Sequence, residues 1–172
     1  GYVHASCERL KGAHINMAFP SVGATENLMT AAVWAEGETI IDNAAREPEI
    51  VDLANFLIQF GTKIEGVGSS QIKIQGRNFS EYNSFPNNEY KIIGDRIEAA
   101  TYVIAGLMTN SEIEVQGFEP AHIKAVTDVL LEMGAKLEIS SKSVKTFKGS
   151  KLKGAKIETA PYPGFPTDVQ AC

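Results

Sequence analysis

The sequence predicts an α/β protein built from repeated strand-helix-strand-helix-strand-strand units. The main observation is an internal repeat, because the segment LKGAHI begins at residue 10 and LKGAKI begins at residue 152. A second match lies about half as far apart: EP…GTKIE over 47–65 returns as EP…GAKLE over 119–138. Matches at this spacing indicate a unit of about 71 residues. The third observation is that hydrophobic periodicity switches between strand and helix in the same order in each copy.

The first half of the first unit reads as strand, helix and strand. Apolar and polar residues alternate over 13–17, and 38–42 is rich in β-branched residues, which predicts two strands. Between them, residues 24–35 have helical spacing, and Ser21 precedes this stretch as a candidate N-cap.

The second half contains an amphipathic helix and a hairpin. Pro48 suits the first turn of a helix, since its missing N–H costs nothing there, and apolar residues continue at helical spacing to residue 60. Gly61 is a typical helix stop. Residues 62–65 and 71–75 predict two strands joined by a glycine-rich turn.

The second unit is expected to repeat this order. Its predicted strands are 90–93 and 112–115, and its predicted helices are 96–108 and 120–133, the last of which ends at Gly134. Two further strands are expected to complete it.

The repeat also divides the chain. A third unit begins at Leu152 and reaches a helix start near its end. Residues 77–88, with several asparagines and a proline, are the best candidate for a linker. We therefore expect a boundary near residue 92, giving parts 1–92 and 93–172; the alternative is a surface loop within one domain.

Composition sets limits on function. The 172 residues are 44% hydrophobic and 22% charged, which is ordinary for a globular chain with a real core. A formal net charge of −5 argues against a nucleic-acid partner. No stretch is apolar enough to span a bilayer, and residues 1–4 do not resemble a secretion signal, so we expect no membrane partner and a cytoplasmic location.

The sequence offers no metal or cofactor site. His4, His14 and His122 have no spacing typical of metal ligands, and Cys7 and Cys172 have no CxxC partner. We therefore expect neither a metal nor a cofactor.

Two expected helix starts carry the candidate site residues. Ser21-Val22-Gly23 and Pro166-Thr167-Asp168 each place a hydroxyl and unpaired backbone N–H groups at a helix N-terminus, where an anion is favoured. Ser21 is equally an ordinary N-cap. Asp168 follows a stiff proline-spaced segment that would fix a carboxylate at a cleft edge, but it too has the simpler interpretation of a turn residue.

Four motifs in the same order resemble the UDP-N-acetylglucosamine enolpyruvyl transferases, which catalyse the first committed step of bacterial peptidoglycan synthesis. The motifs are SVGATEN at 21–27, NAAREPE at 43–49, GDRIE at 94–98 and TAPYPGFPTD at 159–168. The resemblance runs through the whole chain. It implies an inside-out α/β barrel of the enolpyruvyl transferase type, with two domains of three units each. This chain then holds the last unit of one domain, and the first and part of the second unit of the other.

The resemblance also implies roles for single residues. Asp168 matches the aspartate proposed to remove the proton of the sugar 3-hydroxyl, and Thr167 lies beside the sugar nucleotide. Ser21, Val22 and Gly23 match the segment that contacts the substrate diphosphate.

Five further residues match supporting motifs, for which a role in structural salt bridges is expected. Arg46 and Glu47 match a motif near the uridine end of the substrate, while Asp95, Arg96 and Glu98 match an interdomain motif.

The chain departs from the family in two ways. Some relatives have a lysine where this chain has Phe19. The family's loop cysteine, its amino-terminal lysine and its carboxy-terminal arginines fall in segments outside this sequence, and neither Cys7 nor Cys172 matches that cysteine.

The implied activity is transfer of enolpyruvyl from phosphoenolpyruvate to UDP-N-acetylglucosamine, with the remaining segments of the parent enzyme as partners. The fragment alone is expected to be inactive. Two alternatives stay open: the sister enzyme that acts on shikimate 3-phosphate, from which the 159–168 run differs, and a non-catalytic fragment or scaffold.

Overall fold

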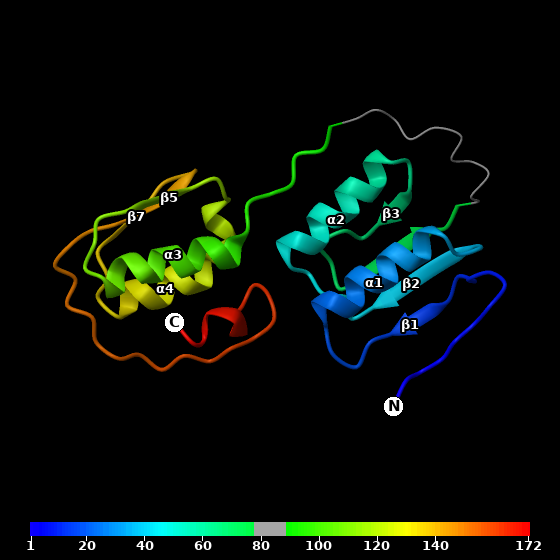
Figure 1. Ribbon diagram of the computed structural model, residues 1–172, viewed down its shortest axis with the longest axis horizontal. Helices are drawn as coiled ribbons and strands as arrows, with labels where there is room; N and C mark the ends of the chain where they lie inside the picture. Colours follow the sequence, from blue (N-terminus) through cyan, green and yellow to red (C-terminus); the bar gives the residue numbers. More distant parts are fainter. Residues whose placement is uncertain (78–88) are drawn as a thin grey trace. The chain divides into compact units, whose positions relative to one another are not determined.

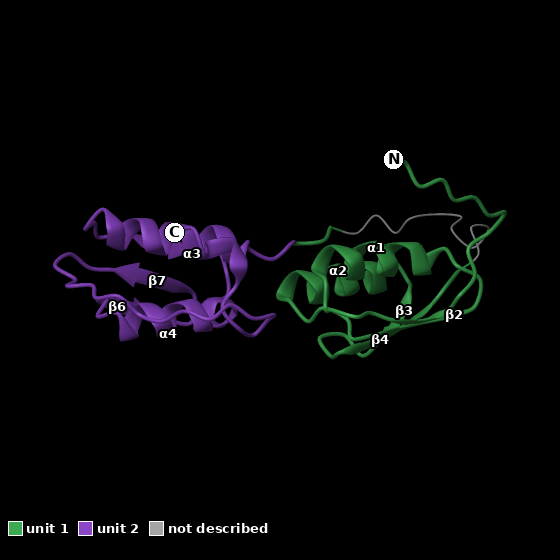
Figure 2. Cartoon of the chain, turned by 90° about the horizontal axis from the view of Figure 1, so that it is seen from below, with its two compact units in different colours: residues 1–91 green, residues 92–172 purple. Residues whose placement is uncertain are grey.

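A four-stranded sheet with two helices on one face forms the first of two units, residues 1–91; the second unit is residues 92–172 (Figures 1 and 2). The computed structural model describes residues 1–77 and 89–172. Residues 78–88 of the expected linker lie outside the described residues. The assignment of the two units to different domains of a larger protein stays a prediction.

The first unit has the predicted order of elements. In chain order these are β1 (His14–Asn16), α1 (Val22–Val33), β2 (Glu38–Asp42), α2 (Pro48–Gln59), β3 (Lys63–Glu65) and β4 (Gln71–Gln75). The sheet order is β1-β2-β4-β3, with β1 and β2 parallel and the other neighbours antiparallel. The strand-helix-strand-helix-strand-strand unit is confirmed here.

One face of this sheet forms the core. Ile41 faces Ile72 across the β2–β4 pair, and both are fully buried, as is Ile74 on the same face. Met29 of α1 and Ile50 of α2 complete the cluster. Successive residues of a strand point to opposite sides, and on β2 and β4 the opposite face carries polar side chains except for Ile40.

The second unit has a three-stranded sheet and two helices. Its elements are α3 (Arg96–Met108), β5 (Glu114–Gln116), η2 (Pro120–Ile123), α4 (Lys124–Glu132), β6 (Leu137–Ile139), β7 (Ser143–Thr146) and η3 (Thr167–Val169). The sheet order is β5-β7-β6, with both pairs antiparallel. Val103, Val126 and Val144 are buried in its core.

The prediction of a strand at 90–93 is wrong. The hydroxyl of Tyr90 donates to the side chain and the backbone carbonyl of Asp52 in α2, at 2.8 and 2.9 Å, and its ring packs edge-on against Phe56. Burial and this carboxylate raise the pKa of Tyr90 to about 12. These contacts hold residue 90 against the first unit, so β5 keeps a single described neighbour, β7.

Three smaller differences concern the second unit. The expected helix at 120–133 begins as one 3-10 turn, η2, before α4. The chain after Leu152 forms no strand, and only Thr159 bridges to Phe165. The expected helix start at Thr167 is a 3-10 turn, η3.

The two units share one helix-ending geometry. Gly61 (φ 90°) and Gly134 (φ 94°) both adopt the left-handed conformation after the second helix of their unit. The next N–H then reaches back to the helix in each case, from Thr62 to Leu57 O at 3.1 Å and from Ala135 to Leu130 O at 2.9 Å. This is the 6→1 bond of a Schellman ending.

Candidate functional site

In the first unit, β1 and β2 are parallel, so the carboxyl ends of both strands lie at the same edge of the sheet. Thr25 links the two segments that follow these strands. Its hydroxyl donates to Ser21 O at 2.7 Å and accepts from Ala45 N at 3.0 Å, and the residue is fully buried. Asn43 adds a second link, from Nδ2 to Met17 O at 2.9 Å. The predicted residues Ser21–Gly23 and Arg46–Glu47 therefore share this edge.

Ser21 is the N-cap of α1, as the sequence predicted. Its hydroxyl accepts from Ala24 N at 3.3 Å, and Thr25 N makes the first intrahelical bond, to Ser21 O at 2.9 Å. The N–H groups of Val22 and Gly23 precede that bond, so they are among the helix donors that lack an intrahelical acceptor. Gly23 is exposed, and a Cβ added there would meet no atom within 4 Å.

Arg46 and Glu47 differ sharply in exposure. Arg46 is exposed, and its Nε donates to Gly68 O at 3.3 Å. Glu47 is only 6% exposed and precedes α2 directly, and its Oε2 accepts from Arg46 N at 2.8 Å. A carboxylate at this position also interacts favourably with the helix dipole. Glu47 thus orders the turn that presents Arg46.

In the second unit, internal hydrogen bonds and two buried residues hold the proline-spaced loop over residues 159–169. Ala160 N donates to Phe165 O at 3.0 Å, and Gly164 N donates to Pro161 O at 2.8 Å. Phe165 and Val169 are buried in the core cluster of this unit. The loop therefore has a fixed path although most of its side chains are exposed.

Thr167 and Asp168 lie in η3 between these buried anchors, and both are exposed. The N-cap position is taken by Pro166, and no side chain caps this turn. Asp168 therefore lies in a turn without capping it. Its carboxylate faces outward from a fixed backbone.

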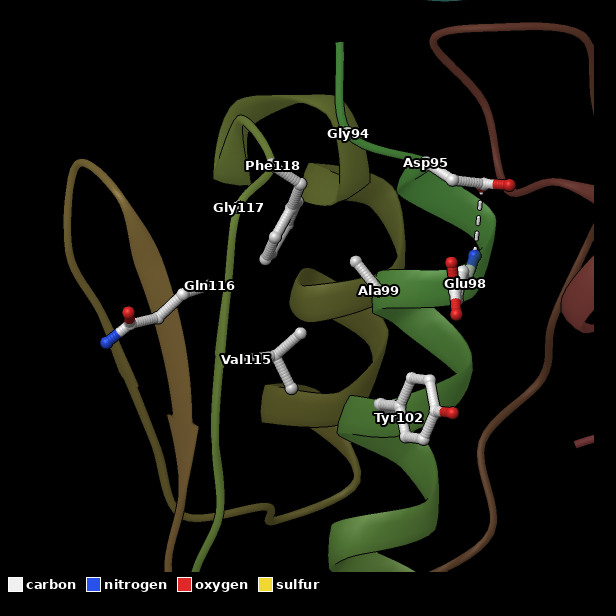
Figure 3. A pocket seen from close by; sticks show the side chains of 9 residues that line it. All are labelled: Gly94, Asp95, Glu98, Ala99, Tyr102, Val115, Gln116, Gly117 and Phe118. Atoms are coloured by element: carbon white, nitrogen blue, oxygen red, sulfur yellow. Dashed lines mark hydrogen bonds between the residues drawn. The ribbon is translucent and has the colours of Figure 1, made fainter. Parts of the chain in front are cut away.

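Asp95 caps α3 in the same way that Ser21 caps α1. Its Oδ1 accepts from Ile97 N at 2.8 Å and from Glu98 N at 3.0 Å. Asp95 and Glu98 also line a pocket of about 270 Å³ between the first turns of α3 and the end of β5, together with Tyr102 (Figure 3). Two residues with carboxylates among those that line it oppose an anionic ligand. We therefore assign neither phosphoenolpyruvate nor a diphosphate to it.

Each unit thus gathers its own predicted residues. Ser21, Val22, Gly23, Arg46 and Glu47 are in the first unit, and Asp95, Arg96, Glu98, Thr167 and Asp168 are in the second. In residues 1–77 and 89–172, no group of three or more His, Cys, Asp or Glu side chains could hold a metal ion. No helix within these ranges has the length and apolarity to cross a membrane.

Sequence reasoning missed Thr25 and Asn43, which join the two site segments. A signal for Thr25 existed, because it occupies the same helical face as Met29, Ala32 and Val33, all of which are buried. A hydroxyl on such a face must find hydrogen-bond partners inside the protein. Asn43 has a positive φ of 56°, which the sequence does not reveal.

The family model for EPSP synthase (3-phosphoshikimate 1-carboxyvinyltransferase) matches residues 1–172. The chain belongs to this family. Among curated relatives, the UDP-N-acetylglucosamine 1-carboxyvinyltransferase of Halothermothrix orenii is 47% identical over 99% of this chain and 40% of its own length. A protein of that name from Symbiobacterium thermophilum is 49% identical over 99% of the chain and 38% of its own length. The chain therefore spans about two fifths of these relatives.

Solved structures of two enolpyruvyl transferases show the same fold. The enolpyruvyl transferase NikO from Streptomyces tendae matches with a TM-score of 0.78 at 22% identity, over 96% of this chain and 41% of that one. EPSP synthase from Acinetobacter baumannii matches with a TM-score of 0.56 at 22% identity, over 86% and 34%. The predicted enolpyruvyl transferase fold is confirmed, and the chain contains part of it.

Proposed function

We propose that this chain is part of an enzyme that transfers enolpyruvyl from phosphoenolpyruvate to the 3-hydroxyl of UDP-N-acetylglucosamine. The observation that carries the proposal is the match of nearly the whole chain to curated relatives named for carboxyvinyl transfer to this sugar nucleotide. The proposal places the enzyme in the cytoplasm, at the first committed step of peptidoglycan synthesis. The remaining segments of the parent polypeptide are its partners.

Asp168 is the general base in this proposal. A sugar hydroxyl is a weak nucleophile near neutral pH, and removal of its proton by a positioned base contributes roughly 10²–10⁴ in rate. The hydroxyl oxygen bonds to carbon 2 of phosphoenolpyruvate and its proton passes to the Asp168 carboxylate, while carbon 3 takes up a proton and becomes a methyl group. Loss of a proton from carbon 3 and of phosphate from carbon 2 then restores the double bond and gives the enolpyruvyl ether. The exposed carboxylate on a core-anchored loop supports this role.

Substrate binding is assigned to the start of α1 and to η3. Ser21, Val22 and Gly23 bind the diphosphate through N–H groups at the positive end of the helix, while Thr167 lies beside the sugar nucleotide. The residues from the supporting motifs are assigned structural roles. Glu47 orders the turn of Arg46, and Asp95 caps α3, as its two bonds to backbone N–H groups indicate.

Substitution of Asp168 tests the proposal. In the full-length parent protein, Asp168→Asn should lower kcat at least tenfold and change the affinity for UDP-N-acetylglucosamine much less, because the amide keeps its size but accepts no proton. Phosphate release and calorimetric titration measure the two quantities. Asp128→Asn is the matched control, since Asp128 is an exposed carboxylate of α4 that pairs with Lys124. A fall in kcat of less than tenfold would remove Asp168 from this role.

Shikimate 3-phosphate is the alternative acceptor, favoured by the description of the matching family model. Phosphate release by the parent protein, measured with each acceptor in turn, decides between them. Turnover with shikimate 3-phosphate and none with UDP-N-acetylglucosamine would replace the proposed substrate.

A further inference from the structure

Arg96 is a buried cation at the N-terminus of a helix, which is an unfavourable position for positive charge. It is the first residue of α3, where the helix dipole disfavours positive charge, and yet it is only 8% exposed. The backbone around it is fixed by the Asp95 cap. A buried arginine at the wrong end of a helix needs compensating contacts elsewhere.

One such contact leads directly to the loop of residues 159–169. The guanidinium carbon of Arg96 lies 5.6 Å from the ring centroid of Tyr162, which is half-buried at the tip of this loop. A cation over an aromatic face is attracted by the ring quadrupole, and more strongly when both groups are partly desolvated. Helix α3 and turn η3 also contact each other.

Close contacts and a hydrogen bond join the two sides of this loop near its tip. A Cβ added at Gly164 would lie 2.6 Å from Ala160 Cβ and 3.0 Å from Pro161 O, so the two sides of the tip are in close contact. The bond from Ala160 N to Phe165 O connects the tip to the buried anchor three residues before Asp168. The tip that carries Tyr162 is thus joined by close contacts and one hydrogen bond to Phe165, and the backbone of Thr167 and Asp168 continues from that residue.

We propose that Arg96 is a positioning residue for Asp168. It holds Tyr162 and thereby sets the path of the loop from which the carboxylate projects. The proposal rests on the proposed function, in which Asp168 takes a proton from the sugar hydroxyl. Proton transfer needs the base within hydrogen-bond reach, and a displacement of about 1 Å can cost about 10²-fold in rate.

The test uses Arg96→Met, Arg96→Lys, Tyr162→Leu and the double variant Arg96→Met/Tyr162→Leu in the full-length parent protein. Arg96→Met and Tyr162→Leu should each lower kcat by about 2- to 30-fold, the range implied by one cation–π contact. The KM for UDP-N-acetylglucosamine should change less. The double variant should be no worse than the poorer single variant, because both remove the same contact. Arg96→Lys keeps the charge but not the planar group, so its loss should be smaller.

Hydrogen exchange provides a readout that does not depend on catalysis. The amides of Ala160 and Gly164, which donate the two loop bonds, should exchange faster in Arg96→Met and in Tyr162→Leu. Lys145→Met is the matched control, because Lys145 lies 5.1 Å from the ring centroid of Phe147, away from this loop. It should leave kcat and both loop amides unchanged.

The outcomes separate this inference from the proposed function. Unchanged exchange at Ala160 and Gly164 in both single variants overturns the inference, whatever the activity. Faster exchange together with unchanged kcat in an active parent also overturns it, since the loop would then move without affecting Asp168. A wild-type parent without transferase activity overturns the proposed function, while the exchange data still decide whether Arg96 orders the loop.

Discussion

Ser21 and Gly23 are two residues apart at the start of α1, yet they have different structural duties. Ser21 caps the helix with its hydroxyl, so Ser21→Ala should lower the free energy of unfolding by about 0.5–2 kcal/mol. Gly23 is in the helix, and a side chain there meets open space, so Gly23→Ala should stabilise the helix by up to about 1 kcal/mol. The two substitutions are expected to change stability in opposite directions.

Ser21→Ala and Gly23→Ala should change substrate affinity in the same direction. If the N–H groups at the start of α1 bind the substrate diphosphate, both substitutions in the parent protein should weaken binding of UDP-N-acetylglucosamine: Ser21→Ala removes a hydroxyl, and Gly23→Ala places a methyl group where the anion approaches. Melting curves and calorimetric titration measure stability and affinity on the same samples. Gly154→Ala, also in open space, is the control for the added methyl group. A Gly23→Ala protein that gains stability at full affinity would contradict diphosphate binding at this turn.

At the scale of elements, Asp42 joins three strands of the first sheet on its polar face. Its carboxylate accepts from Gln71 Nε2 in β4 at 2.7 Å and pairs with His14 Nε2 in β1. The hydrogen bond from Gln71, followed by that from His14, lowers the pKa of Asp42. A native pKa below the unfolded value, about 3.9, means that this group adds stability above that pH and loses it as the pH falls through the native pKa.

Gln71→Leu should therefore raise the pKa of Asp42 toward its ordinary value. It should also reduce the loss of stability that the first unit shows on acidification below about pH 4. NMR titration of the Asp42 carboxyl carbon measures the pKa directly. Gln75→Leu is the matched control, because Gln75 lies on the same strand and the same face of β4. An unchanged pKa in Gln71→Leu would show that Gln71 does not hold the carboxylate.

The elements that the sequence predicts well are those whose signals are local. Pro48 and Gly61 bracket α2 because one lacks an N–H and the other tolerates a positive φ, and neither property depends on the rest of the fold. Residues 90–93 have the composition of a strand, but a strand needs a partner. The bond from Tyr90 to Asp52 spans 38 residues and decides the outcome, and no local pattern reveals it.

The candidate site likewise has one part that local sequence signals predict and another that depends on long-range packing. The cap formed by Ser21 follows from residue type and position, and it was predicted. The anchoring of the loop of residues 159–169 depends on Phe165 and Val169 entering a core built by distant elements, and the contact between Arg96 and Tyr162 depends on the same packing. The sequence identified Asp168, but only the structure shows that it does not cap its turn.

At the scale of the whole molecule, the two units keep the same design with different surfaces. Both use a capped first helix and a glycine-ended second helix, although Ser21 and Asp95 are different residues. The proposed roles differ more: in the first unit the N–H groups of Val22 and Gly23 bind an anion, whereas in the second unit the N–H group of Ile97, which corresponds to that of Gly23, is occupied by the Asp95 carboxylate. The repeat thus fixes the scaffold, and the residue at the cap decides whether the helix start is open to ligand.

The last prediction concerns this 172-residue chain by itself, which should release no phosphate above background from phosphoenolpyruvate with UDP-N-acetylglucosamine. Both substrates are polyanions, and their reaction requires concentrated positive charge, whereas the chain has 16 Lys and Arg against 21 Asp and Glu. It also spans only about two fifths of the relatives it matches. The measurement is phosphate release by the purified chain, with the full-length parent under identical conditions as the positive control. Turnover near that of the parent would show that these 172 residues already hold a complete active site, and would contradict the need for further segments.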